Sequence, residues 1–222
     1  MPTFNTPQPI SAVLDIPAGR VQFIAADRAD TAVEILPADT SKSRDVKVAE
    51  QTTVEYRDGV LRIEASAKNQ YFGPSGAIEA TVQLPAGSHV TVKAASAEVR
   101  AVGQFGDVTV ESQHGLITLD EAASARLTTA AGDVSVGRLN GPAKIRTSKG
   151  DIRIAEAIRG TVELRTDAGQ VQVGAAAGVS ASLNAGTSSG RIHNSLNNTE
   201  GTAAQLTIHA TTAVGDIIAR SL

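Results

Sequence analysis

The sequence predicts an all-β fold: a parallel β-helix (β-solenoid) with coils of about 18 residues, preceded by a less regular N-terminal β region. Two observations predict it. A short motif that begins with glycine and alternates aliphatic and polar residues recurs in the second half of the chain, and its aliphatic residues occupy equivalent positions in successive copies. The copies are Gly115–Leu119, Gly132–Val136, Gly150–Ile154, Gly169–Val173, Gly190–His193 and Gly215–Ala219.

The spacing of these glycines defines the coil. They lie 17, 18, 19, 21 and 25 residues apart, so the period lengthens toward the C-terminus. A second short alternating segment precedes each glycine, which gives two strands per coil with a turn between them. Glycine supplies the positive φ that a sharp corner needs.

Equivalent positions of successive coils form two aliphatic columns. The residues between the column members, such as Thr109 and Lys144, are polar, as in strands with one buried face. Helices, with about 3.6 residues per turn, cannot maintain such columns. The first column is Val92, Val110, Leu127, Ile145, Leu164, Leu183 and Ile208, and the second is Val99, Ile117, Val134, Ile152, Val171, Ile192 and Ile217.

Hairpins in a β-sandwich are also compatible with two strands joined within about 18 residues. The regular recurrence of the same strand type favours parallel stacking of coils instead, at about 4.8 Å per coil.

Residues with hydroxyl side chains form a further column that points inward. We expect this column at a corner of the coil, where the hydroxyls can hydrogen-bond to each other and to the backbone of the turn. They are Ser112, Thr129, Thr147 and Thr166.

The period is absent before residue 86. Asp58-Gly59 separates two alternating segments and predicts a hairpin. We expect residues 1–85 to form irregular strands and a hairpin that start the solenoid and cap its first coil. Residues 86–222 are expected to form the solenoid repeats, within one continuous domain.

A resemblance to a known family rests on five segments: Leu84–Gly87, Gly106–Val110, Gly132–Val136, Thr147–Ile152 and Val214–Ile217. They resemble bacterial β-strand-repeat proteins of unknown function described as "putative adhesins". The resemblance covers most of the chain and implies a β-solenoid fold. It supplies no catalytic residue, because a fold of this kind does not determine a function.

Composition limits the partners. A net charge of −3 gives no broad basic field, which argues against nucleic acid and against an anionic membrane. The chain has no cysteine, so disulfides and thiolate chemistry are excluded. No signal-peptide pattern and no apolar run of about 18 residues occurs. We therefore expect no membrane insertion and a cytoplasmic location, or the cell surface if a signal was removed.

Histidines and aspartates are the candidates for metal and acid–base sites. Asp133 and Asp151 follow glycine in adjacent coils, so this pair could bind calcium or act as acid and base. The mixed residues at this position in other coils favour a hydrogen bond from each aspartate to its own turn. We expect no metal and no cofactor, since none of the histidines has metal-ligand spacing. They are His89, His114, His193 and His209.

Enzymatic activity is disfavoured. Some parallel β-helices are polysaccharide lyases or hydrolases, but their grooves need aromatic platforms. Aromatic residues make up 3% of this chain, and Phe105 is the only one in the repeat region. No nucleophile elbow occurs. A carbohydrate-active enzyme is therefore the least favoured of the functions considered.

Tyr71 and Phe72 lie in a loop flanked by glycine and proline, which makes this loop a candidate binding site. The alternative is that the loop folds back over the first coil as a lid.

The C-terminal strand is a second candidate site. Its motif ends three residues before the terminus, and Ile217, Ile218 and Leu222 would border an unpaired edge. We therefore expect a structural or protein-interaction β-solenoid that self-associates, as a dimer or a filament. The alternative is a surface adhesin or glycan-binding module, with a protein or glycan partner.

Overall fold

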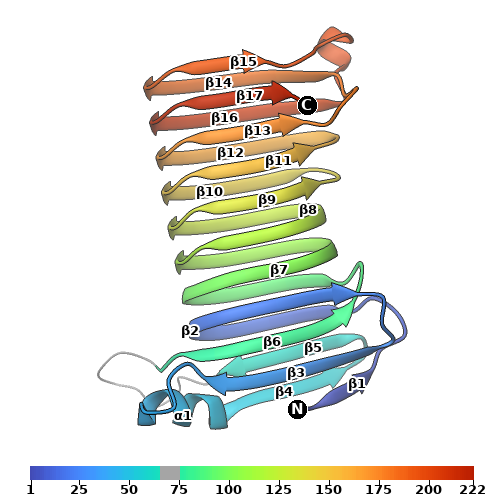
Figure 1. Cartoon of the computed structure of the whole chain (residues 1–222), viewed down its shortest axis with the longest axis vertical. Helices are drawn as coiled ribbons and strands as arrows, with labels where there is room; N and C mark the ends of the chain where they lie inside the picture. Colours follow the sequence, from blue (N-terminus) through green and yellow to red (C-terminus); the bar gives the residue numbers. More distant parts are fainter. Residues whose placement is uncertain (66–75) are drawn as a thin grey trace. The chain divides into compact units, whose positions relative to one another are not determined.

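The computed structural model describes residues 1–65 and 76–222, except for the side chain of Thr202, and most of these residues are in strands. Two compact units divide the chain, Met1–Gly115 and Leu116–Leu222 (Figure 1). Parallel strands in register confirm the β-solenoid predicted from the repeats. The division predicted between residues 85 and 86 stays a prediction.

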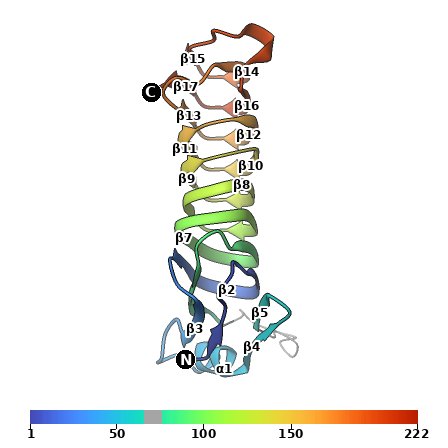
Figure 2. The same ribbon diagram turned by 90° about the vertical axis from the view of Figure 1, so that its right-hand side faces the viewer.

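The C-terminal unit is a stack of flat coils whose strands form two parallel sheets (Figure 2). Because β8 bends around a corner, it contributes to both sheets. Sheet 1 has the order β8–β9–β11–β13–β17–β15, and sheet 2 has the order β8–β10–β12–β16–β14. The strands are β8 (Ile117–Ala131), β9 (Val134–Leu139), β10 (Ala143–Lys149), β11 (Ile152–Ala157), β12 (Gly160–Ala168), β13 (Val171–Ala175), β14 (Ala181–Ser189), β15 (Ile192–Ser195), β16 (Leu206–Val214) and β17 (Ile217–Ser221).

Chain order and stacking order differ at the end of this unit. β16 lies between β12 and β14, and β17 lies between β13 and β15. The last coil of the sequence is therefore inserted into the stack, and the coil of β14 and β15 follows it. This corrects the expectation that the C-terminal strand is the last strand of the stack.

The second aliphatic column has the predicted register within this unit, because Ile217 pairs with both Val171 and Ile192. The first column departs from prediction at its end. Ile208 pairs with Val162 and Leu183, which is a shift of two residues from the expected Leu164. A shift of two preserves the inward parity of a strand, and Ile208 is fully buried.

Glycine and threonine build one corner of each coil. Gly150 has a φ of +146°, and a Cβ there would lie 2.2 Å from the Gly132 carbonyl oxygen. The Thr147 hydroxyl donates to that carbonyl at 3.2 Å. Thr166, Thr212 and Thr187 repeat this bond to Gly150, Gly169 and Gly215 in their neighbouring coils. The predicted hydroxyl column thus satisfies the backbone at the corner.

The N-terminal unit is built around a central coil formed by β2. One edge of β2 pairs in parallel with β5 and β6, and its other edge pairs in parallel with β7. The first long strand of the chain is therefore an interior strand. The elements are β1 (Thr3–Asn5), β2 (Ser11–Ala26), β3 (Asp30–Pro37), α1 (Ser43–Gln51), β4 (Thr52–Arg57), β5 (Val60–Ala65), β6 (Ile78–Pro85) and β7 (His89–His114).

Antiparallel strands cover one end of this unit. β4 pairs with β5, β3 pairs with β6, and β1 pairs with β3. The β4–β5 hairpin predicted at Asp58-Gly59 is confirmed, with positive φ at both turn residues. The rings of Phe4 in β1 and Tyr56 in β4 lie 5.4 Å apart, and α1 buries Val48 beside this end.

Candidate functional site

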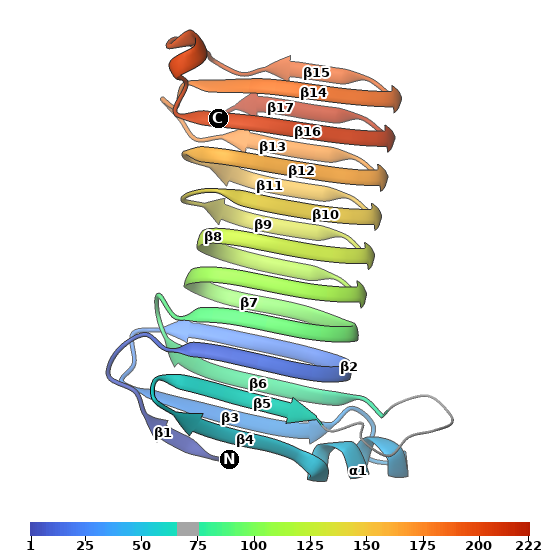
Figure 3. The ribbon, with the colours of Figure 1, turned by 180° about the vertical axis from the view of Figure 1, so that it is seen from behind.

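The open end of the C-terminal unit is formed by β14 and β15. Among the described residues, β14 pairs only with β16 and β15 only with β17. In Figure 3 these two strands end their sheets. A strand that is paired on one side directs its remaining backbone N–H and C=O groups away from the sheet, where another strand can bind them.

Inward side chains are exposed at this end. Ile192 is 45% exposed, whereas its column neighbour Ile217 is fully buried. Leu183 is half-buried, and all four residues of β15 are exposed. The end therefore presents apolar side chains next to unpaired strand edges.

The loop of residues 196–205 covers only one corner of this surface. The Ala181 N–H donates to the Asn197 carbonyl oxygen at 2.9 Å. The buried Ser180 hydroxyl oxygen accepts the N–H groups of Thr199 and Glu200, each at 3.1 Å. These bonds hold the loop over the beginning of β14, and β15 is exposed along its length.

The candidate residues of the C-terminal strand do not lie at this edge. Ile217 is fully buried, Ile218 is half-buried, and Leu222 is 54% exposed. Backbone pairing on both sides of β17 removes the unpaired edge that was expected there. The sequence contained one signal of this arrangement, the 25-residue spacing between Gly190 and Gly215. Tyr71 and Phe72, the other candidates, lie outside the described residues.

Asp133 and Asp151 have a structural role between coils. Asp133 Oδ1 accepts the Asp151 N–H at 2.8 Å, and Asp151 Oδ1 accepts the Gln170 N–H at 2.7 Å. Each carboxylate therefore binds the backbone of the next coil, which corrects the expected bond to its own turn. Within residues 1–65 and 76–222, no group of three or more histidine, aspartate or glutamate side chains could hold a metal ion.

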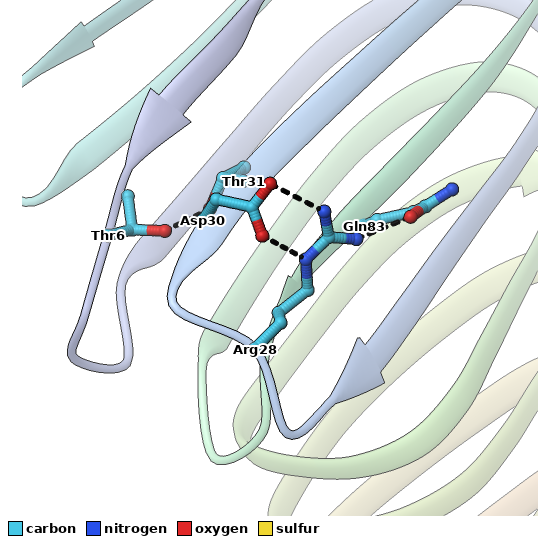
Figure 4. Close-up of polar contacts among 5 residues, drawn as sticks. All are labelled: Thr6, Arg28, Asp30, Thr31 and Gln83. Atoms are coloured by element: carbon cyan, nitrogen blue, oxygen red, sulfur yellow. Dashed lines mark hydrogen bonds and ion pairs between the residues drawn. The ribbon is translucent and has the colours of Figure 1, made fainter.

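A polar cluster in the N-terminal unit was not anticipated from the sequence (Figure 4). Arg28 binds both carboxylate oxygens of Asp30, at 2.9 and 3.0 Å, and also binds the Gln83 side-chain oxygen. Hydrogen bonding from Arg28 holds the pKa of Asp30 below its usual value. The hydroxyls of Thr6 and Thr31 bind each other nearby, at 2.8 Å and buried. The partners within the cluster indicate that it fastens the turn after β2 to β6.

Comparison with known proteins identifies the family and the fold. A family model described as Toastrack DUF4097 matches residues 13–217. A solved structure of a "putative adhesin" from Bacteroides fragilis is similar at 12% identity and a TM-score of 0.51, covering 98% of this chain and 95% of that one. Another, from Parabacteroides distasonis, is 13% identical with a TM-score of 0.48, covering 100% and 95%. No curated protein matches. No described helix is long and apolar enough to cross a membrane.

Proposed function

We propose that this chain, which belongs to the Toastrack DUF4097 family, is a non-enzymatic interaction module that forms a dimer through the open end of its C-terminal unit. One observation carries the proposal: β14 and β15 are paired on one side only, and Ile192 and Leu183 are exposed there. The description of the Bacteroides fragilis structure as an adhesin supports a binding role over an enzymatic one.

The composition of β14 supports an interaction at this edge. Proteins protect exposed strand edges from other chains with charged residues, proline or a covering element. None of the nine residues of β14 is charged or proline, and the loop bonds to its first residue, Ala181. The edge therefore lacks the features that would prevent a strand from binding.

A second copy of the chain is the simplest occupant. Its open end presents the same two strands at the same separation, so two ends match in width when they meet about a two-fold axis. The edge strands of the N-terminal unit, β1 and β4, pair antiparallel with β3 and β5, so among the described residues they do not repeat the two parallel edge strands of the open end. Contact between two identical open ends, which gives a closed dimer, is therefore favoured over a head-to-tail filament.

Light scattering at increasing protein concentration tests the proposal. The wild type is expected to dimerise, and Ile192→Lys should make it monomeric because the lysine places a charge within the interface. Ile218→Lys is the matched control. Ile218 is half-buried and lies on β17, which is paired with β15, so it does not belong to the open end. A wild type that stays monomeric at high micromolar concentration, or equal effects of both variants, would contradict the proposal.

A surface adhesin is the second candidate, favoured by the description of the Bacteroides fragilis structure. The two functions differ in location, because the dimerisation module is expected in the cytoplasm and an adhesin at the surface. Fractionation of cells that express the native gene, followed by surface proteolysis, distinguishes them.

A further inference from the structure

The two outer faces of the C-terminal unit differ in charge. Sheet 1 carries balanced charges, with Arg138, Arg153 and Arg220 against Asp120, Glu121 and Glu156. Sheet 2 has an excess of positively charged residues, which lie on β8, β10 and β12. Its cations are Arg126, Lys144, Arg146, Lys149 and Arg165, and its acids are Glu163 and Asp167.

Like charges face each other across neighbouring strands of sheet 2. Lys144 pairs in register with Arg126, and Arg146 pairs in register with Arg165. Such pairs are destabilising. Opposite charges face each other around Arg20 in the N-terminal unit, which lies between Glu79 and Glu98 and forms ion pairs with both at 3.3 Å.

The acids of sheet 2 neutralise only part of this charge. Glu163 binds Lys144 at 3.0 Å, and Asp167 lies 3.7 Å from Arg165. In the described part of the chain, Arg126, Arg146 and Lys149 form no ion pair and are exposed. The Lys144 hydrogen bond and charge, with weaker effects of Arg146 and His209, hold the pKa of Glu163 below its usual value, which agrees with a positive potential at this face.

We propose that the outer face of sheet 2 binds an acidic polysaccharide, with Arg126, Lys144, Arg146 and Arg165 contacting its carboxylate or sulfate groups. Charge complementarity carries the proposal, because a bound anion removes the repulsion between the paired cations. Arginine suits this role, since its planar guanidinium binds carboxylate and sulfate oxygens in pairs.

The neighbouring side chains favour a sugar over other polyanions. Thr128 and Thr211 flank the arginines in register and offer hydroxyls to sugar hydroxyl groups. The C-terminal unit contains no phenylalanine, tyrosine or tryptophan, so it lacks the stacking surfaces that single-stranded nucleic acids use. A flat sheet face also offers no element to enter the groove of a duplex.

Titration of the full-length protein with polygalacturonate at low salt tests this face, with dextran as the neutral control. We expect binding that weakens as salt rises. The double variant Arg126→Gln/Arg146→Gln should weaken it about tenfold. Its Tm should stay equal or rise, because two like-charge contacts are removed. The matched control is Arg153→Gln/Arg220→Gln on sheet 1.

Each other outcome overturns the proposal. An absence of binding to polygalacturonate, or an equal loss in both double variants, shows that this face is not the site. Binding to phosphatidylserine vesicles or to oligodeoxythymidylate, without binding to polygalacturonate, assigns the face to a membrane or a nucleic acid. The proposed dimer uses the open end and not the outer face of sheet 2. Ile192→Lys should therefore bind polygalacturonate as the wild type does.

Discussion

The antiparallel end of the N-terminal unit and the open end of the C-terminal unit differ in how their strand edges are paired. Stacked coils leave unpaired strand edges where the stack stops. In the N-terminal unit β4, β3 and β1 pair antiparallel over that edge, and Phe4 contacts Tyr56 between two of them. In the C-terminal unit β14 and β15 carry no such cover beyond the loop at one corner.

This difference indicates which end is available for association. Both units place the coil nearest a chain terminus inside the stack, as β2 between β5/β6 and β7, and as β16/β17 between β12/β13 and β14/β15. In the C-terminal unit the edge is therefore formed by an internal segment, β14 and β15. The N-terminal unit adds antiparallel strands beyond its coils, among which β3 is paired on both sides, and the C-terminal unit adds none. This difference supports the end of the C-terminal unit as the proposed interaction surface.

The largest expected effect is on stability, and it differs between an interior strand and the open end. Ile217→Asp places a charge at a fully buried position, which should cost more than about 4 kcal/mol. Ile192→Asp alters the next position of the same column, where 45% exposure lets water reach the charge, and should cost about 1 kcal/mol.

Thermal unfolding followed by circular dichroism at low micromolar concentration measures both variants in the monomer. Equal losses of stability in the two variants would contradict the interior position of β17.

An intermediate effect on stability is expected when a corner inside the stack is compared with the last coil. Gly150→Ala should destabilise by about 2–4 kcal/mol, because φ is +146° and the new methyl would lie 2.2 Å from a backbone oxygen. Gly186→Ala in β14 meets nothing within 4 Å and should be neutral or stabilising by up to about 1 kcal/mol.

Chemical denaturation measures the two glycine variants side by side. A loss in Gly186→Ala as large as that in Gly150→Ala would show that the last coil is as tightly packed as the interior.

Sequence reasoning predicted the coils because their evidence is local and repeated. The alternation of aliphatic and polar residues defines the inward face, and Asp58-Gly59 defines a hairpin. The stacking order was not predictable in this way, since every coil offers the same aliphatic column. Ile217 fits between Val171 and Ile192 as well as it would fit at the end.

The polar cluster also depended on distant residues. Arg28 and Asp30 are two residues apart, but Gln83, which completes the cluster, is 55 residues from Arg28. The two like-charge pairs of sheet 2 likewise became visible only when the register of β8, β10 and β12 was known. The functional candidates therefore lie where pairing between strands, and not local pattern, decides the neighbours.

The smallest expected effect concerns the capped unit and its dependence on pH. Because Arg28 lowers the pKa of Asp30 in the folded state, their interaction stabilises the protein above the unfolded pKa of about 3.9 and is lost as the pH falls through the lower folded value. Asp30→Asn should therefore lower the Tm by at most about 3 °C at neutral pH, and the difference from wild type should shrink in acid. Asp15→Asn is the control, since Asp15 is exposed on β2 and forms no ion pair among the described residues. A difference between wild type and Asp30→Asn that stays constant from pH 7 to about pH 2 would show that the contribution of Asp30 does not come from its charge.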